Sequence, residues 1–512
     1  CVVGDDAQSI YSFRGARIDN ILQFTDLYKG ARLFKLEQNY RSTQTIVEAA
    51  NSLISYNKRQ IRKQVFSKND EGSPLLLNIA YSDVEEGEIV CNRIVRLHRD
   101  EGVPYGQMAV LYRTNAQSRI FEEGLRGHSV PYRIYGGQSF YDQKEIRDVL
   151  AYFRLAVNPN DEEALKRIIN VPKRGIGTTT VGRIIQCAHE NGWGIGDVVA
   201  DARKYVPSLS AATLKKIEGF HHMMAGFTES LAKDDAYTLG ERILKESGIW
   251  REAYRQNDAE SREVQNNLSE LLNGINTFVE MQRESGEESR LLLTDYLSEV
   301  SLLSDQDSDD GDADDRVTLM TVHAAKGLEF DAVFVVGMEE NLFPNAMSMH
   351  SERQLEEERR LFYVALTRAR RYCCLSASKS RFKYGKMEFC EPSSFLYEID
   401  RRYLRMESGR STARRDDERE AQPTASGAAI GVQRRLKPVG RAEATAGDEQ
   451  HEQAMVDGRL LRVGDRVEHE RFGQGTIAAL EGEEGNMKAL IDFDNSGKKK
   501  LLLKYAKVKV IK

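Results

Sequence analysis

Length and charge set the first limits on what this protein can be. The chain has 512 residues, 30% of them charged, and a formal net charge of -6 at neutral pH. Because one hydrophobic core rarely supports a chain of this length, we expect at least three domains. The mildly acidic balance excludes a protein that binds nucleic acid through its overall charge, so any such site must be local.

Cysteine usage and hydropathy indicate the compartment. The six cysteines include no CxxC pair, which predicts reduced thiols with neither disulfides nor zinc. No apolar run approaches the roughly 18–20 residues of a membrane span, and no signal peptide opens the chain. We expect a cytoplasmic protein without membrane contact. The opening segment 1–5 is typical of the end of a buried strand, so we interpret the chain as part of a longer protein.

The predicted elements change character along the chain. Helical spacing at 45–54 is followed by continuous apolar runs at 108–112 and 332–337, which are typical of strands buried on both faces of a parallel α/β sheet. Between the two runs, residues 136–312 have mostly helical spacing, as at 145–155 and 263–281, and predict an all-α insertion. The acidic run 304–315 indicates a solvated loop; a calcium loop is the alternative, but the closing Glu is missing.

The C-terminal part divides into two segments of different composition. Residues 403–457 lack aromatic side chains almost entirely and are rich in Ala, Arg, Glu and Ser, which predicts a disordered linker. Residues 458–512 alternate apolar and polar positions between turns, which indicates a small β-barrel. A barrel of this size is usually an interaction module, because its core is small.

Four separated segments carry specific residue combinations. They are GDDAQSIYSFRGA at 4–16, LEQNYRS at 36–42, TVHAAKGLEF at 321–330 and ERRLFYVALTRA at 358–369. In this order they resemble motifs III to VI of superfamily 1 DNA helicases of the UvrD/PcrA/Rep type. The resemblance spans nearly the whole chain, and four motifs in the right order make it specific.

The resemblance implies a domain organisation. It makes residues 1–36 the end of a first RecA-like lobe, and 37–135 with 313–402 a second RecA-like (P-loop NTPase) motor lobe of the α/β class. Residues 136–312 would be a helical insertion that contacts duplex DNA. Residues 403–457 would link the motor to a Tudor/SH3-like barrel at 458–512.

A nucleotide site is also implied by the resemblance. Arg41 and Arg368 are similar to the two finger arginines that stabilise charge on the γ-phosphate of ATP, a role for which a planar guanidinium is suited. Gln8 resembles the glutamine that senses this phosphate. Tyr40 is similar to the tyrosine that stacks on adenine, and Glu329 to the carboxylate that reaches the ribose. Outside these motifs, each residue could equally serve packing.

Contacts to DNA are implied at several further positions. Tyr11 and Phe13 resemble the aromatics that stack on bases of single-stranded DNA, although relatives often have Trp at the position of Phe13. A second departure is Gln143, where relatives often carry an arginine. The resemblance places backbone contacts at Arg14, Arg113, Asn115, Arg119 and His323, duplex contacts at Gly175, Ile176 and Gly177, and a strand-separating tip at Tyr384.

The absence of two motifs shapes the expected activity. The sequence contains no Gly-x-x-x-x-Gly-Lys-Ser/Thr loop and no Asp-Glu pair before Gln8, so we expect the ligands of Mg²⁺ and the anchor of ATP upstream of Cys1. We predict that this chain alone neither hydrolyses ATP nor unwinds DNA. The intact protein should be an ATP-dependent 3′-to-5′ DNA helicase of repair or replication that binds single-stranded and duplex DNA and works with repair proteins.

A second hypothesis comes from the terminal barrel. It resembles the Tudor-like tail by which PcrA-type helicases bind RNA polymerase, so the main task of the protein could be recruitment to transcription. A polymerase pull-down would discriminate the two hypotheses.

Overall fold

The computed structural model of the protein describes residues 1–256, 258–286, 290–305, 315–383, 386–407, 455–456, 459–482 and 487–511. Tyr384, most of the acidic run and most of the predicted linker lie outside these residues. Within them, no helix combines the length and apolar character that crossing a bilayer requires. The six cysteines, all within the described part of the chain, form no disulfide.

The N-terminal segment consists of short helices held by polar contacts. They are the 3₁₀ helices η1 (Asp6–Gln8) and η2 (Ser12–Arg14) and the α-helices α1 (Asp19–Leu22) and α2 (Phe24–Leu27). The Asp6 carboxylate accepts a hydrogen bond from the Ile61 amide at 2.8 Å, and Lys63 forms ion pairs with Asp5 and Asp6 at 2.5 and 3.2 Å. Strand β1 (Gln38–Asn39) then pairs in parallel with β2 (Phe66–Ser67).

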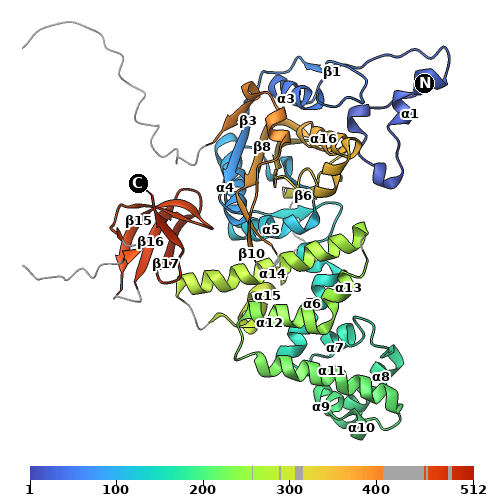
Figure 1. The fold of residues 1–512 in the computed structure, drawn as a ribbon, viewed down its shortest axis with the longest axis vertical. Helices are drawn as coiled ribbons and strands as arrows, with labels where there is room; N and C mark the ends of the chain where they lie inside the picture. Colours follow the sequence, from blue (N-terminus) through green and yellow to red (C-terminus); the bar gives the residue numbers. More distant parts are fainter. Residues whose placement is uncertain are drawn as a thin grey trace, which may run out of the picture.

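A seven-stranded sheet forms the centre of the molecule (Figure 1). Its order is β11-β3-β8-β7-β4-β6-β5, and every neighbouring pair is parallel. The strands predicted at 108–112 and 332–337 correspond to β4 and β7. The strands are β3 (Leu75–Ala80), β4 (Met108–Tyr112), β5 (Tyr132–Ile134), β6 (Val317–Thr321), β7 (Phe330–Val335), β8 (Ala369–Ser378) and β11 (Leu404–Met406).

Helices cover both faces of this sheet, which explains the continuous apolar runs. Successive strand residues point to opposite faces. Leu111 packs in the core beneath α3 (Gln44–Ile54) and α16 (Glu352–Leu366). Its neighbour Val110 packs in the core beneath α4 (Asp83–Glu101) and α5 (Ser118–Gly127). Both strand residues are fully buried.

A hairpin extends from the sheet beyond β8. It is formed by β9 (Ser380–Lys383) and β10 (Lys386–Phe389), and the short helix α17 (Phe395–Glu398) follows. Arg381 at its base is buried and forms ion pairs with Glu86 at 2.5 Å and Glu339 at 2.7 Å. Because breaking a buried pair leaves an uncompensated charge, this network fixes where the hairpin leaves the lobe.

In the described part of the stretch between β5 and β6, ten α-helices form a body with its own hydrophobic core (Figure 1). The longest, α14, runs beneath the sheet toward the terminal barrel. The predicted helical patterns at 145–155 and 263–281 lie in α6 and α14. The helices are α6 (Lys144–Val157), α7 (Glu162–Ile168), α8 (Thr178–Asn191), α9 (Ile195–Ala200), α10 (Ala202–Tyr205), α11 (Ala211–Ser230), α12 (Ala236–Ser247), α13 (Ile249–Ala253), α14 (Ala259–Ser285) and α15 (Leu293–Asp305).

The C-terminal part is an antiparallel sheet of five strands in the order β17-β16-β15-β14-β18. Alternate residues point inward, so Val467, Ile477, Ile491 and Phe493 form a small separate core. The five strands are β14 (Arg466–His469), β15 (Gly473–Glu481), β16 (Lys488–Phe493), β17 (Gly497–Leu502) and β18 (Val508–Val510), preceded by β12 (Met455–Val456) and β13 (Arg459–Leu460). We call residues 459–511 the barrel.

Candidate functional site

Arg41 lies where β1 turns into α3 and is held from three sides. The Asn39 side chain accepts a hydrogen bond from the Arg41 amide at 2.8 Å, which fixes the turn. The Arg41 guanidinium donates through Nε to Glu329 at 2.5 Å and through Nη1 to the Thr367 carbonyl at 3.0 Å. Segments that are far apart in the chain therefore meet at this one side chain.

Arg368 lies next to Arg41, between the end of α16 and the start of β8. Its guanidinium donates to the carbonyls of Val364 and Leu328 at 2.9 and 3.0 Å and to the Thr367 hydroxyl at 3.1 Å. The residue is only 2% exposed. Burial, and then the nearby charge of Arg41, lower the pKa of Arg368 to about 10, so it stays cationic at neutral pH.

Glu329 is the carboxylate around which the cluster is organised. Hydrogen bonds from Arg370, at 2.5 Å, and from Arg41 lower the pKa of Glu329 to about 2. The carboxylate is therefore ionised at any physiological pH. Beside it, Tyr40 is 78% exposed, so its ring is available to a flat ligand. We call Arg41, Glu329, Arg368 and Arg370 the arginine cluster.

Gln8 lies on the N-terminal segment, facing the same lobe. Its side-chain amide donates to Asp5 at 2.7 Å, and its backbone carbonyl accepts from the Lys326 ammonium at 2.9 Å. Burial, and then the charge of Asp5, raise the pKa of Tyr363 to about 12, and Arg368 also acts on this phenol. The buried Tyr363 belongs to the same hydrophobic core as Ala7 and Ile10 of the N-terminal segment.

The arginine cluster suits a polyphosphate. Guanidinium groups pair with phosphate oxygens through parallel N–H bonds, and an exposed tyrosine ring can stack on a base. Among the described residues, no group of three or more His, Cys, Asp or Glu side chains could hold a metal ion. The described residues therefore fit the triphosphate of a nucleotide, while the position of Mg²⁺ stays a prediction.

A second site is a groove of about 490 Å³ on the same lobe. Its walls come from η2, the loop after β4, the turn after β6, α14 and α16, so it too joins remote segments. The lining residues used below are Ser12, Phe13, Arg113, Asn115, Glu263, His323, Glu357 and Glu358. We call this the groove.

Aromatic side chains gather at one end of the groove. Phe13 is 65% exposed, and its ring meets the His323 ring edge to face at 5.4 Å. Tyr11 donates from its hydroxyl to the His323 carbonyl at 3.1 Å, and Arg14 lies over the rings of Tyr11 and Phe13 at 5.7 and 5.5 Å. Phe13 thus offers an open face for stacking, while Tyr11 is fixed in place.

His323 is neutral in this environment. Burial, and then the positive charges of Arg113 and Arg14, lower the pKa of His323 to about 4. Its imidazole can therefore donate or accept a hydrogen bond at neutral pH but adds no positive charge for a phosphate.

Three polar groups of the groove are bonded to carboxylates. Arg113 forms a two-pronged pair with Glu358 at 2.7 and 3.0 Å. The Ser12 amide donates to Glu357 at 2.9 Å, and the Asn115 side chain donates to Glu263 of α14. If the groove takes DNA as the resemblance implies, these carboxylates occupy donors that a phosphate would use, and an incoming strand would have to exchange with them.

Sequence reasoning did not anticipate Glu263 and Glu357 as part of this site. Glu357 directly precedes the fourth motif, and its place in the helix could have suggested that it faces the same side as its neighbours. Glu263 had no local signal, because 148 positions separate it from Asn115.

Some predicted DNA-contacting residues lie elsewhere. Arg119 is 3% exposed and forms ion pairs with Glu123 and Glu270, both at 2.7 Å, so its guanidinium does not face the groove in this conformation. Tyr384 lies outside the described residues. The Gln143 side chain donates to the Gln138 carbonyl at 3.2 Å.

The Gly-Ile-Gly segment lies far from the groove, at the start of α8. Ile176 is buried, and the amides of Gly175 and Ile176 donate to the Asn170 side chain at 2.9 and 3.3 Å. The donors that remain for a phosphate are those of the first turn of α8, which follows Gly177.

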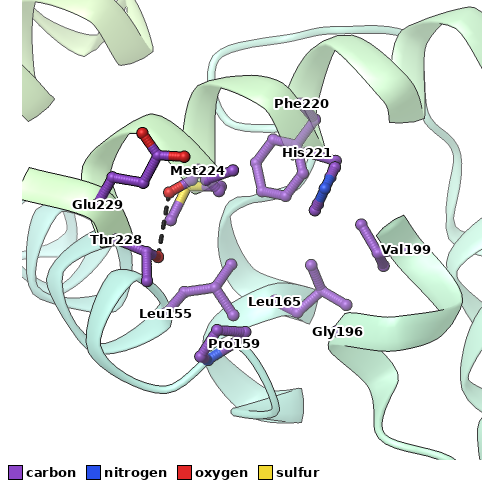
Figure 2. A pocket seen from close by; sticks show the side chains of 11 residues that line it. Leu155, Pro159, Leu165, Gly196, Val199, Phe220, His221, Met224, Thr228 and Glu229 are labelled. Atoms are coloured by element: carbon purple, nitrogen blue, oxygen red, sulfur yellow. Dashed lines mark hydrogen bonds between the residues drawn. The ribbon is translucent and has the colours of Figure 1, made fainter. Parts of the chain in front are cut away.

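A further pocket of about 270 Å³ lies among α6, α7, α9 and α11 (Figure 2). Its walls are mainly apolar. The Thr228 hydroxyl donates to the backbone carbonyls of Ala156 at 2.9 Å and Met224 at 3.2 Å. His221 and Glu229 lie at its sides without a mutual bond in Figure 2. We therefore do not assign chemistry to this pocket.

Comparison with known proteins finds three family matches along the chain. Residues 34–380 match the UvrD-like helicase C-terminal domain, residues 1–29 the UvrD/REP helicase N-terminal domain, and residues 463–509 the PcrA/UvrD tudor domain. The first of these matches covers both the arginine cluster and most of the groove.

Individual relatives are similar over the whole length of this chain. DNA helicase II of Salmonella typhimurium strain LT2 is 35% identical over 514 residues, which are 100% of this chain and 66% of the relative. ATP-dependent DNA helicase PcrA of Leuconostoc citreum is 35% identical over 520 residues, covering 100% of this chain and 67% of the relative. PcrA of Staphylococcus aureus strain Mu50 is 36% identical over 513 residues, with 99% and 66% covered.

The chain thus spans about two thirds of the length of these relatives. A family match over residues 34–380 and an identity of about 35% along the full chain are enough to show the family. The chain belongs to the UvrD/PcrA family of DNA helicases.

Proposed function

We propose that this chain provides the second RecA-like motor lobe, a helical insertion and a Tudor-like barrel to an ATP-dependent 3′-to-5′ DNA helicase. The parallel sheet with helices on both faces supports the RecA-like assignment. Helices α6 to α15 would then be the insertion that meets duplex DNA. The polarity of movement rests on the family resemblance.

The observation that carries this proposal is the arginine cluster. Arg41 and Arg368 come from different segments, yet both donate to Thr367, through its carbonyl and its hydroxyl. Their positions are set by backbone carbonyls, so they need not reorganise when negative charge develops on a phosphate. ATP would supply the phosphoryl group that passes to water, with Mg²⁺ neutralising its phosphates.

In this proposal, each described residue has a defined task. Arg41 and Arg368 stabilise the charge that develops on the γ-phosphate. Glu329 orients Arg41 and is exposed enough to accept a hydrogen bond from a ribose hydroxyl, while Tyr40 stacks on the base. Gln8 lies on the N-terminal segment, where its backbone carbonyl accepts a hydrogen bond from Lys326 of the third motif.

Removing one arginine tests the proposal. In the complete gene product, Arg368→Ala should lower the rate of DNA-stimulated ATP hydrolysis by about 10³-fold or more, because a finger arginine contributes that much. Arg371→Ala is the matched control, since Arg371 lies three residues further along the chain, is exposed on β8 and contacts Tyr372 instead. The two variants should bind single-stranded DNA equally. An Arg368→Ala protein that hydrolyses ATP normally would refute the nucleotide site.

A second candidate function concerns the barrel. Its separate core and its match to the PcrA/UvrD tudor domain support a binding module for RNA polymerase. The full chain should then retain purified RNA polymerase in a pull-down, and a chain ending at Asp457 should not. Equal retention by both chains would exclude the barrel as the contact.

A further inference from the structure

Three of the five glutamates of helix α14 lie at intervals of seven or fourteen residues, which places them along one side of the helix. Glu263 accepts from Asn115 in the groove. Glu270 pairs with Arg119 of α5 at 2.7 Å. Glu284, near the end of the helix, faces the barrel. From Glu263 to Glu284 the helix spans about 30 Å, so a single rigid element connects the groove to the barrel.

The contact between Glu284 and the barrel is buried. The Glu284 side chain is 5% exposed and lies 3.4 Å from the Arg471 guanidinium and 3.3 Å from Nε2 of His469. Nδ1 of His469 accepts a hydrogen bond from the Arg471 amide at 3.1 Å, which leaves Nε2 as the protonated nitrogen. Nε2 lies near the carboxylate but makes no hydrogen bond to it. One residue further along α14, the Ser285 carbonyl accepts from Lys488 of β16 at 3.2 Å.

A second group of contacts lies where β3 leads into α4. Tyr81 accepts a hydrogen bond from Gln474 at 2.8 Å, and Glu85 accepts from Asn495 at 3.0 Å. Gly473 approaches so closely that a Cβ at this position would lie 2.2 Å from Oε1 of Glu85, and its φ of +77° also requires glycine. The Ser82 hydroxyl donates to the backbone carbonyl of Arg471, two residues before Gly473, at 2.6 Å.

We propose that the end of α14 and the start of α4 form a docking surface for the chain's own barrel, and that α14 links this docking to the state of the groove. The contacts are mainly polar. They include the buried carboxylate of Glu284, which pairs with the Arg471 guanidinium and lies beside the His469 ring of the barrel. Since barrel and lobe belong to one chain, their high effective concentration lets such a polar surface hold them together reversibly.

The direction of the linkage follows from the geometry. A docked barrel holds the end of α14, and the same helix places Glu263 on Asn115. When the barrel leaves, the end of α14 loses its partners Arg471 and Lys488, and Glu263 yields Asn115 to DNA more easily. Docking and binding of single-stranded DNA therefore oppose each other, and by linkage each weakens the other to the same extent.

A charge reversal tests the docking surface. Glu284→Lys would face Arg471 and His469 and should release the barrel, which small-angle X-ray scattering of the full chain detects as a larger radius of gyration. Glu280→Lys is the matched control, because Glu280 lies one turn away on α14 and pairs with Arg283 of the same helix. Combining Glu284→Lys with Arg471→Glu should restore the smaller radius. A Glu284→Lys chain with an unchanged radius overturns the docking surface.

The linkage needs a second measurement on the same proteins, and it rests on the proposed function because it assumes that the groove binds DNA. In fluorescence anisotropy with labelled oligo(dT), Glu284→Lys should lower the Kd about fivefold, at the lower end of common coupling effects. The double variant should return to the Kd of the parent chain. Undocking without a change of Kd overturns the linkage. A parent chain that fails to bind oligo(dT) refutes the proposed function, while the scattering still decides on docking.

Discussion

The arginine cluster and the groove use the same residue types in different balance. In the cluster, Arg41 and Arg370 share the carboxylate of Glu329, and Arg370 also pairs with Asp331 at 3.3 Å. Arg368, among the described residues, donates to carbonyls and a hydroxyl but to no carboxylate. In the groove, Arg113 instead forms a complete two-pronged pair with a carboxylate of its own. The cluster keeps positive charge for a ligand, and the groove neutralises it internally.

The different charge balance of the cluster and the groove indicates how each would hold its ligand. A polyphosphate concentrates negative charge at one point, and uncompensated guanidinium groups answer that need. A strand that must slide through the groove is better held by contacts that are easily exchanged and blind to sequence, such as stacking. We therefore expect affinity for single-stranded DNA to depend more on Phe13 than on Arg113.

The larger test of this comparison removes the exposed ring. Phe13→Ala should raise the Kd for oligo(dT) by about 10- to 100-fold, because stacking on one base contributes about 1–3 kcal/mol. Arg113→Ala should have a smaller effect, since its charge is already paired with Glu358. Phe34→Ala serves as the control, because Phe34 is 80% exposed but outside the groove. Anisotropy titrations measure all three, and a larger loss from Arg113→Ala would reverse the comparison.

The sequence was a good guide where the signal is local. The buried strands β4 and β7 are continuous apolar runs, and α14 has helical spacing over most of its length, so each could be predicted from neighbouring residues. The arginine cluster likewise brings together residues from three of the four motifs, namely Arg41, Glu329 and Arg368. Each of these predictions rests on residues close together in the chain.

The sequence was a poor guide where the partner is remote. The pair of Asn115 with Glu263 and the burial of Arg119 against Glu270 both depend on how α14 lies beneath the lobe, and no short pattern records that. The docking of the barrel depends in the same way on Glu284. Arg119 in particular belongs to a segment that resembles a DNA-contacting one, yet its ion pair with Glu270 holds α14.

The smallest expected effect concerns the pH dependence of DNA binding and of stability, and it depends on His323 of the groove. Because the pKa of His323 is lowered from 6.5 to about 4, the imidazole stays neutral as the pH falls from about 7.5 to about 5.5, and its protonation cannot strengthen phosphate binding there. The Kd for oligo(dT) should therefore change in parallel for the parent chain and His323→Asn over this range.

The stability of the two proteins should differ instead. Between about pH 6.5 and pH 4 the unfolded state binds the extra proton, so the parent chain loses stability as the pH falls and His323→Asn loses less. Thermal denaturation along the same pH series measures this, and a parent chain that binds DNA more tightly only below pH 6.5 would show that His323 acts as a cation in the groove.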